Sequence, residues 1–345
     1  MRQRLTTILV LALVGALVVA VVVDTERGGG QHRRPDRGPA SRVEPLAAGQ
    51  LAGRLLYADT DCRVVQVDLA TLRSETLTRS GGHCRFWPSP DGRWLAMHIG
   101  RPFVPPLPLE VLDLRTGRIT RPLHRPDYAV APPAWSADSR TLAVCDARNP
   151  GERLVQVDVA SGRVSPVRSD ACFPAYAAGR LAYREIGGAV HLDGRTLADA
   201  GTLTRLLGFA VDQIPGIAGQ GPTLAVPTTR VTVPGGVPPL TTVVLYDGGD
   251  RQVSQVWQSG VIAQEVSLLD GGRIVAARAD DRLVIRTLSG RRLSSAGDLP
   301  IVAAAASPDG RTLALATPAR LILADATTGA ARFSLPIATT WVAWR

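Results

Sequence analysis

Hydrophobic and polar positions change in short runs along most of the chain, and residues typical of tight turns separate the runs. Residues 307–315 show the pattern: a Ser-Pro-Asp-Gly turn and an arginine come before an apolar stretch of strand-forming residues. Proline presets φ in such a turn, aspartate accepts hydrogen bonds from the turn backbone, and glycine supplies the positive φ that closes a hairpin. Close copies occupy residues 89–97 and 136–144. The pattern predicts a recurring β-hairpin.

A second recurring hairpin has an apolar strand that ends in aspartate, followed by threonine or serine, glycine and a polar strand. Its copies differ in clarity, and one has arginine in the aspartate position; they lie at Asp68, Asp113, Asp158, Asp193, Asp247, Arg286 and Asp325. Their mean spacing is about 43 residues, the length of a four-stranded propeller blade. The sequence therefore predicts an all-β fold, a seven-bladed β-propeller over residues 51–345, with six or eight blades as alternatives.

The repeated aspartates have two possible roles. They could form a ring of carboxylates, but their constant place before a Thr/Ser-x-Gly turn predicts that they accept hydrogen bonds from the turn backbone. Asp59 and Asp61 alternate as in a fragment of a calcium loop. Without further acids nearby, these two residues are predicted to form a turn.

The two ends of the predicted propeller complement each other. Residues 340–345 resemble the strand that precedes the turn in other repeats, whereas residues 53–58 open the domain without such a strand. We therefore expect the C-terminal strand to complete the first blade, which leaves no open sheet edge between the first and last blades.

One insertion interrupts the repeats. The segment from Pro227 to Leu240 is rich in proline and glycine and falls in the widest gap between aspartate positions. It is predicted to project as a long loop, which is either a binding element or a tolerated surface insertion.

An uncharged run of 19 residues, from Leu5 to Val23, follows two arginines near the N-terminus. As a helix it would be about 28 Å long, close to the ~30 Å of a hydrocarbon core. By the positive-inside bias, residues 1–4 are cytoplasmic and everything after Val23 is extracytoplasmic. We expect a single-pass signal anchor in the cell membrane. The alternative is a signal peptide cleaved near Ala20, which would give a secreted protein.

Residues 24–50 connect this run to the repeats. They contain three consecutive glycines, three prolines and many charges, with few large apolar residues. This composition predicts a disordered linker between the membrane and the propeller.

The chain is basic, with a net charge of +9 and no lysine among its 39 basic residues. A lysine-free chain rich in arginine, alanine, glycine and proline is typical of a GC-rich bacterial genome, so the charge is weak evidence for a nucleic-acid partner. Acids lie among the arginines, and no basic block alternates with stacking aromatic residues. We expect a solvated surface of mixed charge and no nucleic-acid binding.

Four cysteines, Cys62, Cys84, Cys145 and Cys172, lie in the part predicted to be exported. Their spacing contains no Cys-x-x-Cys, which argues against a structural zinc site. An even number in an oxidising compartment predicts two disulfides, for which three pairings are possible. We favour Cys62 with Cys84 and Cys145 with Cys172, because each bond would link one blade to its successor. Four buried free thiols are the alternative.

Other motifs that carry chemistry are missing from the sequence. The five histidines have no metal-ligand spacing, and there is no Gly-x-Ser-x-Gly elbow or phosphate-binding Gly-Lys loop. These histidines are His32, His83, His98, His124 and His191. We therefore assign no catalytic, cofactor-binding or metal-ligating residue and no cofactor.

The Trp-Ser-x-Asp-x-Arg-x-Leu-Ala pattern around Trp135 resembles the repeat of TolB-like β-propellers. The strand-Asp-x-x-Thr-Gly hairpin is also similar to that of the wider Trp-Asp and quinoprotein-like propellers. The resemblance covers residues 51–345 and is faint between residues 171 and 295. It implies a bladed ring used mainly as a binding platform, and it carries over no functional residue.

Two functions fit these features. The first is a membrane-tethered extracytoplasmic platform that binds a protein or envelope ligand without catalysis. The alternative is a propeller enzyme, such as a lyase, lactonase or glycan hydrolase, whose acids and bases meet at the central channel from different blades. Carboxylates or histidines that meet at a deep channel mouth would favour the enzyme.

Overall fold

A computed structural model describes most of the chain after residue 51. The described residues are 52–100, 108–123, 131–148, 151–230, 240–248, 252–259, 265–279, 282–288, 291–293 and 300–345. The predicted anchor from Leu5 to Val23, the predicted linker, His32 and His124 lie outside them. Among these described residues, no helix combines the length and the apolar character needed to cross a membrane. Residues 43–345 group into one compact unit.

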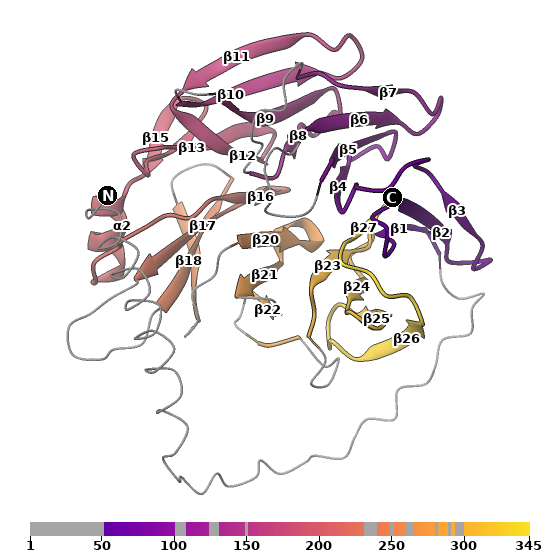
Figure 1. Cartoon of the computed structure of the whole chain (residues 1–345). Helices are drawn as coiled ribbons and strands as arrows, with labels where there is room; N and C mark the ends of the chain where they lie inside the picture. Colours follow the sequence, from indigo (N-terminus) through magenta and orange to yellow (C-terminus); the bar gives the residue numbers. More distant parts are fainter. Residues whose placement is uncertain are drawn as a thin grey trace, which may run out of the picture. The chain divides into compact units, whose positions relative to one another are not determined.

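Seven antiparallel sheets make up the described structure and confirm the prediction of a seven-bladed β-propeller (Figure 1). Blade 1 contains β27 (Val342–Trp344), β1 (Arg54–Ala58), β2 (Val64–Asp68) and β3 (Ser74–Thr76). Blade 2 contains β4 (Arg85–Pro88), β5 (Trp94–His98), β6 (Leu109–Asp113) and β7 (Ile119–Thr120). Blade 3 contains β8 (Ala134–Trp135), β9 (Thr141–Arg148), β10 (Gly151–Asp158) and β11 (Val164–Ser169).

The remaining blades follow the same order from the innermost strand outward. Blade 4 contains β12 (Ala171–Ala177), β13 (Arg180–Glu185), β14 (Val190–Leu192) and β15 (Arg195–Ala198). Blade 5 contains β16 (Ala218–Gln220), β17 (Thr223–Arg230), β18 (Leu240–Asp247) and β19 (Gln252–Ser259). Blade 6 contains β20 (Glu265–Leu269), β21 (Ile274–Ala279) and β22 (Arg282–Thr287). Blade 7 contains β23 (Ala303–Ala306), β24 (Thr312–Ala316), β25 (Leu321–Asp325) and β26 (Ala331–Leu335).

The hydrophobic core lies between neighbouring blades. Leu55 of β1 packs in a cluster with residues of blade 7, whereas Leu56, the next residue, packs in a cluster with residues of blade 2. Both side chains are fully buried. Each interior strand thus buries both faces, which explains why apolar residues follow one another without a polar residue between them. In β24, Leu313 faces blade 6 and Ala314 faces blade 1 in the same way.

The strand β27 closes the ring. It pairs with β1, with Leu55 opposite Trp344 and Tyr57 opposite Val342. Trp344 also reaches blade 7, because its indole Nε1 donates to the carbonyl of Ala305 at 3.2 Å. Trp341, just before β27, donates to the carbonyl of Phe86 in blade 2 at 2.7 Å. Blade 1 is therefore assembled from both ends of the propeller sequence and is bonded to both neighbours.

The Ser-x-Asp-Gly motif forms the turn between the first and second strands. Ser89 Oγ donates to Asp91 Oδ1 at 2.5 Å and accepts the backbone N–H of Trp94 at 2.9 Å. The same pair of bonds recurs at Ser136 and at Ser307. Gly92 and Gly310 have φ values of 68° and 69°, and Ser139 takes the same position with a φ of 61°.

Four of the repeated aspartates, Asp68, Asp113, Asp158 and Asp325, cap the turn between the third and fourth strands, as the sequence predicts. Asp325 Oδ1 accepts the backbone N–H groups of Thr327 at 3.0 Å and of Thr328 at 2.8 Å. Asp158 makes the equivalent contacts with Ser161. Hydrogen bonds from Ser161 lower the pKa of Asp158, and those from Thr71 lower the pKa of Asp68. These carboxylates therefore stabilise the turns in which they lie.

The prediction of a long loop from Pro227 to Leu240 is wrong in part. Residues up to Arg230 continue β17, and Leu240 already belongs to β18. Proline is tolerated at position 227 because β16 pairs only as far as Ala225, so β17 is an edge there. Residues 231–239 lie outside the described residues.

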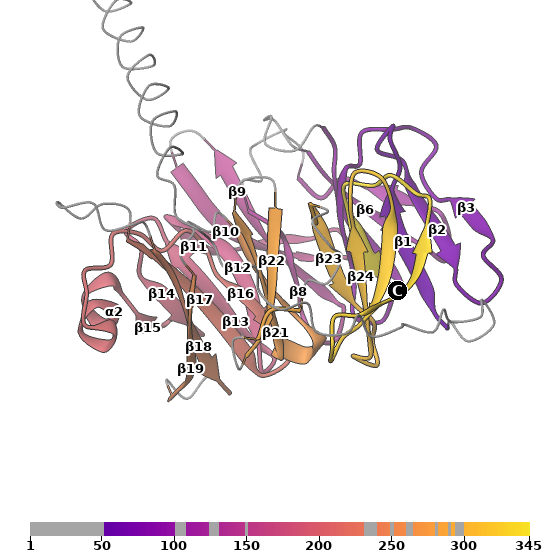
Figure 2. The same ribbon diagram turned by 90° about the horizontal axis from the view of Figure 1, so that it is seen from below.

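A short helix, α2 (Ala200–Leu207), occupies part of the wide gap between repeats and is absent from the predicted elements. It lies beside blades 4 and 5 at the outside of the ring (Figures 1 and 2). Asp199 caps its N-terminus by accepting the N–H of Thr202 at 2.6 Å, and Gly208 ends it with a φ of 73°. Leu203 is fully buried between the two blades.

Two disulfides are present, with the pairing favoured from the sequence. Cys62, in the β1–β2 connection, bonds Cys84, which precedes β4. Cys145 of β9 bonds Cys172 of β12. Each bond joins one blade to its successor, and none of the four cysteines is free.

Deleting residues 340–345 should destabilise the whole propeller, because blade 1 would lose its inner strand and its bonds to both neighbours. We expect the unfolding midpoint to fall by roughly 10 °C or more, since removal of a buried tryptophan alone costs ~3–5 kcal/mol. Trp344→Phe is the matched control, which keeps the ring but loses the Nε1–H donor, and a fall of a few °C is expected. Unchanged thermal unfolding of the deletion would contradict ring closure by β27.

Thiol titration should find no free cysteine in the denatured, unreduced protein. A Cys62→Ser variant should expose one thiol, that of Cys84, and leave the bond between Cys145 and Cys172 intact. Each lost bond should cost ~3 kcal/mol of unfolding free energy in the chain-entropy description. Four titratable thiols in the unmodified protein would refute both disulfides.

Candidate functional site: the central channel

The innermost strands of the blades surround a central channel with a volume of about 690 Å³. Residues from all seven blades line it. The innermost strand of each sheet pairs on one side only, so its other edge presents unpaired peptide groups. The channel wall therefore combines backbone donors and acceptors with whatever side chains extend from these strands.

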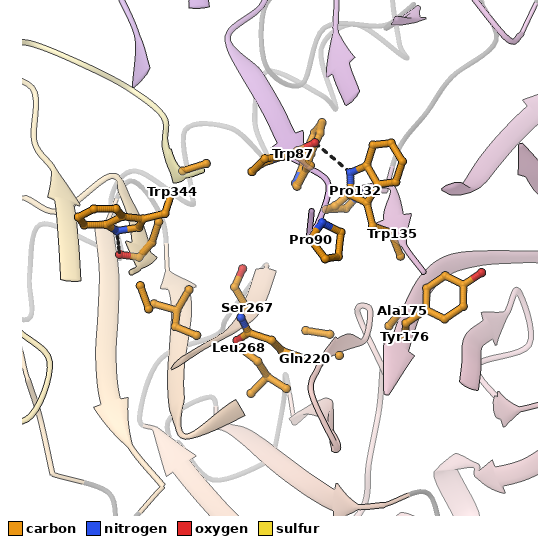
Figure 3. Close-up of a pocket in the computed structure, with 18 of the residues that line it drawn as sticks. Trp87, Pro90, Pro132, Trp135, Ala175, Tyr176, Gln220, Ser267, Leu268 and Trp344 are labelled. Carbon is orange, nitrogen blue, oxygen red and sulfur yellow. Dashed lines mark hydrogen bonds between the residues drawn. The ribbon is translucent and has the colours of Figure 1, made fainter. Parts of the chain in front are cut away.

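Aromatic residues and prolines are frequent in the lining, and Trp87, Trp135, Trp344 and Pro90 are among those labelled in Figure 3. The aromatic members are Phe86, Trp87, Trp135, Tyr176, Trp341 and Trp344. The proline members are Pro88, Pro90, Pro132, Pro133, Pro174 and Pro308. Blade 7 contributes small residues instead, from Ala303 to Ala306. The result is a rigid wall with little side-chain freedom to lose on binding.

Tryptophan indoles fix the inner strands to one another. Trp135 Nε1 of blade 3 donates to the carbonyl of Trp87 in blade 2 at 2.9 Å. The bonds from Trp341 and Trp344 do the same on either side of blade 1. Trp87 also meets Trp341 edge to face, with 5.6 Å between ring centroids. These contacts satisfy some of the free carbonyl groups and link the inner strands of neighbouring blades.

The polar side chains in the lining are mostly engaged. The Tyr176 hydroxyl accepts Gln156 Nε2 at 2.9 Å. Gln220 is different, because its Oε1 is buried and has no hydrogen-bond partner among the described residues. It belongs to the channel wall across from Trp87 (Figure 3). Because its Oε1 is buried, this oxygen is not open to a ligand in the channel.

Charge is sparse in the described lining, where Asp270 is the one acidic side chain and Arg345 the one basic side chain. Asp270 pairs with Arg273 at 3.2 Å. Arg345 donates to the carbonyl of Gly92 at 2.8 Å and to Gln66 Oε1 at 2.6 Å. Both charges therefore have partners within the protein, and the open space of the channel is close to neutral.

His83 and His191 lie away from the channel lining, between blades. His83 Nε2 is 2.9 Å from Glu110 Oε2, and both side chains are buried. Arg121 binds the other oxygen of Glu110 at 2.7 Å. His191 stacks on Tyr183 with 5.1 Å between ring centroids. His83 is therefore held by a buried polar contact, and His191 by packing against an aromatic ring.

His98 supports the channel wall from behind. It is buried at the end of β5, and its ring meets Trp87 edge to face with 4.7 Å between centroids. Burial lowers the pKa of His98 to about 4, with a smaller contribution from repulsion by Arg85. The imidazole is therefore neutral at physiological pH.

Two groups of side chains that could in principle bind a cation are engaged in other interactions. Glu152 lies within 4.8 Å of the sulfur atoms of Cys145 and Cys172, but these sulfurs are bonded to each other and offer no thiolate. Asp59 accepts the backbone N–H groups of Asp61 at 3.0 Å and of Arg63 at 2.8 Å. The pair Asp59 and Asp61 thus belongs to a turn, as the sequence predicts.

The sequence did not mark the channel residues as functional. Trp135 and Trp341 are part of the repeat pattern. The recurrence of a tryptophan near the end of the innermost strand was the signal that could have identified them as channel residues. Gln220 and Tyr176 lie in the region where the repeats are faint. Their meeting depends on the ring, because the lining residues come from all seven blades.

No protein-family model matches this sequence, and no curated protein sequence matches it. Among solved structures, the chain is similar to TolB from Acinetobacter baumannii, with a TM-score of 0.50, 16% identity, and coverage of 87% of this chain and 68% of that one. An oligogalacturonate lyase from Vibrio parahaemolyticus gives a TM-score of 0.54 at 13% identity, over 80% of this chain and 85% of that one.

The β-propeller domain of Cps50 (Swd1) from Myceliophteria thermophila gives a TM-score of 0.51 at 15% identity, over 76% of this chain and 88% of that one. Similarity at these identities shows the fold alone. The chain is thus a seven-bladed β-propeller whose fold is similar to those of a TolB protein, a lyase and a Trp-Asp repeat domain.

Stability should fall as the pH drops from about 6.5 to 4, because in that range unfolded His98 takes up a proton that buried His98 refuses. Between pH 7 and pH 5 this residue should account for about 2 kcal/mol of lost unfolding free energy. His98→Phe keeps an aromatic ring against Trp87 and should remove that part of the pH dependence. Denaturant unfolding at the two pH values measures it. Equal losses in the parent and the variant would show that His98 is not the responsible group.

Proposed function

We propose that this protein is a membrane-tethered extracytoplasmic β-propeller that binds a protein segment or an envelope ligand in its central channel without transforming it. The observation that carries the proposal is the lining: free strand edges, a wall of tryptophan and proline, and little charge. Such a wall suits an extended, uncharged segment that offers hydrogen-bond donors and apolar surface.

The free edges of the innermost strands support this choice of ligand chemistry. Their backbone N–H and carbonyl groups would pair with the acceptors and donors of a bound ligand. The aromatic wall would add contact with apolar or ring-shaped groups. Together these features favour a neutral peptide stretch or a neutral sugar unit over an anion or a cation.

The membrane tether in this proposal comes from the sequence. The apolar run from Leu5 to Val23 is long enough to span a bilayer, and the two disulfides suit an oxidising compartment outside the cytoplasm. The linker of residues 24–50 would let the propeller reach ligands near the membrane surface.

An enzyme with its site at the channel is the second candidate, and the lyase among the similar folds is the observation that favours it. General acid-base chemistry needs two titratable groups close together. In the described channel lining, Asp270 is the one carboxylate side chain, and it is paired with Arg273. Binding is therefore the better supported function.

The test is affinity capture from the envelope of the source cell with immobilised residues 43–345, which hold all seven sheets and both disulfides. Ser267→Arg places bulk and charge in the channel, toward which the Ser267 side chain points (Figure 3). Ser334→Arg is the matched control on β26, the outermost strand of blade 7, where the serine is exposed. We expect a component that the parent and the Ser334 variant retain and that the Ser267 variant retains roughly tenfold less.

Equal retention by the Ser267 variant would place the binding site elsewhere. Mass spectrometry of the recovered ligand separates the two functions. An unaltered ligand supports binding, whereas a cleaved or rearranged one would establish the enzyme.

A further inference from the structure

Arginines recur at one end of the blades because both turn motifs end in this residue. Arg93, Arg140 and Arg311 follow the turn between the first and second strands, and Arg118 and Arg163 follow the turn between the third and fourth strands. We call the end of the propeller formed by these two sets of turns the turn face. Its exposed arginines include Arg54, Arg73, Arg115, Arg118, Arg140, Arg163, Arg195, Arg273, Arg291 and Arg311.

The two sets of turns lie side by side. In a four-stranded antiparallel blade, the first and third turns are at the same end of the sheet. Backbone bonds join them directly: the N–H of Leu114 donates to the carbonyl of Arg93 at 2.8 Å, and that of Val159 to the carbonyl of Arg140 at 3.1 Å. The arginines that follow both turns therefore share one surface.

The acids of the turn face are engaged in the turns themselves. Asp68, Asp158 and Asp325 accept hydrogen bonds from their own turn backbone. Some arginines of this face also pair with carboxylates, as Arg93 does with Asp113 at 3.2 Å and Arg273 with Asp270 at 3.2 Å. No ion pair is present for Arg73, Arg115, Arg118, Arg163 or Arg195 among the described residues, so these guanidinium groups are available to a partner.

Two exposed apolar side chains accompany these arginines. Leu72 is 38% exposed and directly precedes Arg73 in the third turn of blade 1. Ile119 is 43% exposed and directly follows Arg118 in blade 2. The neighbouring blades 1 and 2 thus each present a cation beside a large apolar group, the combination typical of surfaces that lie at a lipid interface.

The chain also enters the propeller at this face. β1 starts at Arg54, and the N–H of Leu69 donates to the carbonyl of Gly53 at 3.1 Å. Leu69 opens the same turn that carries Leu72 and Arg73. The segment predicted to link the apolar run to the propeller therefore joins it beside the cationic and apolar groups.

We infer that the turn face docks on the anionic lipid headgroups of a membrane, with blades 1 and 2 nearest the surface. Arg73, Arg115 and Arg118 pair with headgroup phosphates, and Leu72 and Ile119 enter the interface between headgroups and acyl chains. The inference rests on the proposed tether, which holds the propeller near such a surface, and does not depend on what the channel binds.

Vesicle binding by residues 43–345, which lack the apolar run, tests the inference. The probes are neutral phosphatidylcholine vesicles and vesicles with about 30% phosphatidylglycerol, in about 0.1 M salt. Arg73→Glu with Arg118→Glu reverses two charges of the turn face. Arg79→Glu with Arg320→Glu is the matched control, since both arginines are exposed and lie in connections at the opposite end of the blades.

We expect binding to the anionic vesicles, no binding to the neutral ones, at least ~10-fold weaker binding for the turn-face variant and less than ~2-fold change for the control. Leu72→Asn with Ile119→Thr should weaken binding several-fold, and asparagine accepts the positive φ of 56° at position 72. Thermal unfolding of each variant confirms that it is folded.

Several results would overturn the inference. These are no binding to anionic vesicles, equal binding to neutral ones, or equal losses in the control and the turn-face variant. Tighter binding of a soluble anionic polysaccharide than of vesicles would assign the turn face to a glycan instead. None of these results bears on the channel, which the capture experiment tests separately.

Discussion

The structure depends on the burial of both faces of each blade against its neighbours. Leu55 and Leu56 are adjacent in the sequence, yet one packs toward blade 7 and the other toward blade 2. A single blade would leave both of these apolar faces in water, so the sheets are stable as a ring. The ring in turn must close, because an open one would expose two apolar faces and an unpaired strand edge. β27 provides this closure by pairing with β1, while Trp344 in the strand and Trp341 just before it reach the blades on either side.

The parts of this fold that depend on local chemistry could be predicted from the sequence. A serine, an aspartate and a glycine within four residues define a turn whatever surrounds it, and the spacing of the second hairpin, at the aspartate positions, gives the number of blades. The cysteine pairing followed from the blade period. The helix α2 and the strand through Pro227 could not be predicted, because both depend on their surroundings: Leu203 is held by two blades, and Pro227 is tolerated where β16 has ended.

The channel could not be predicted from the sequence for a related reason. Trp87 and Trp135 are 48 residues apart, and the hydrogen bond between them exists only when their blades are adjacent. Each blade contributes a few atoms to the wall, so no stretch of sequence contains a site. The same holds for Gln220, whose lack of a partner depends on what the other strands place around it. Sequence patterns reveal the residues that recur among the repeats, whereas the channel is lined by residues that differ from one repeat to the next.

The turn face differs from the channel in this respect, because it is formed by residues that recur in the repeats. The aspartate of each motif is needed to close its turn, and its Oδ1 accepts backbone N–H groups. Most of the arginines that follow the turns extend into solvent, although Arg93 pairs with Asp113. One isolated arginine on a surface contributes little to binding, but the ring repeats it around one end, where the guanidinium groups act on the same partner. A motif that stabilises a hairpin therefore also brings exposed arginines to one end of the ring, and the channel and the turn face differ in chemistry because they derive from different parts of the repeat.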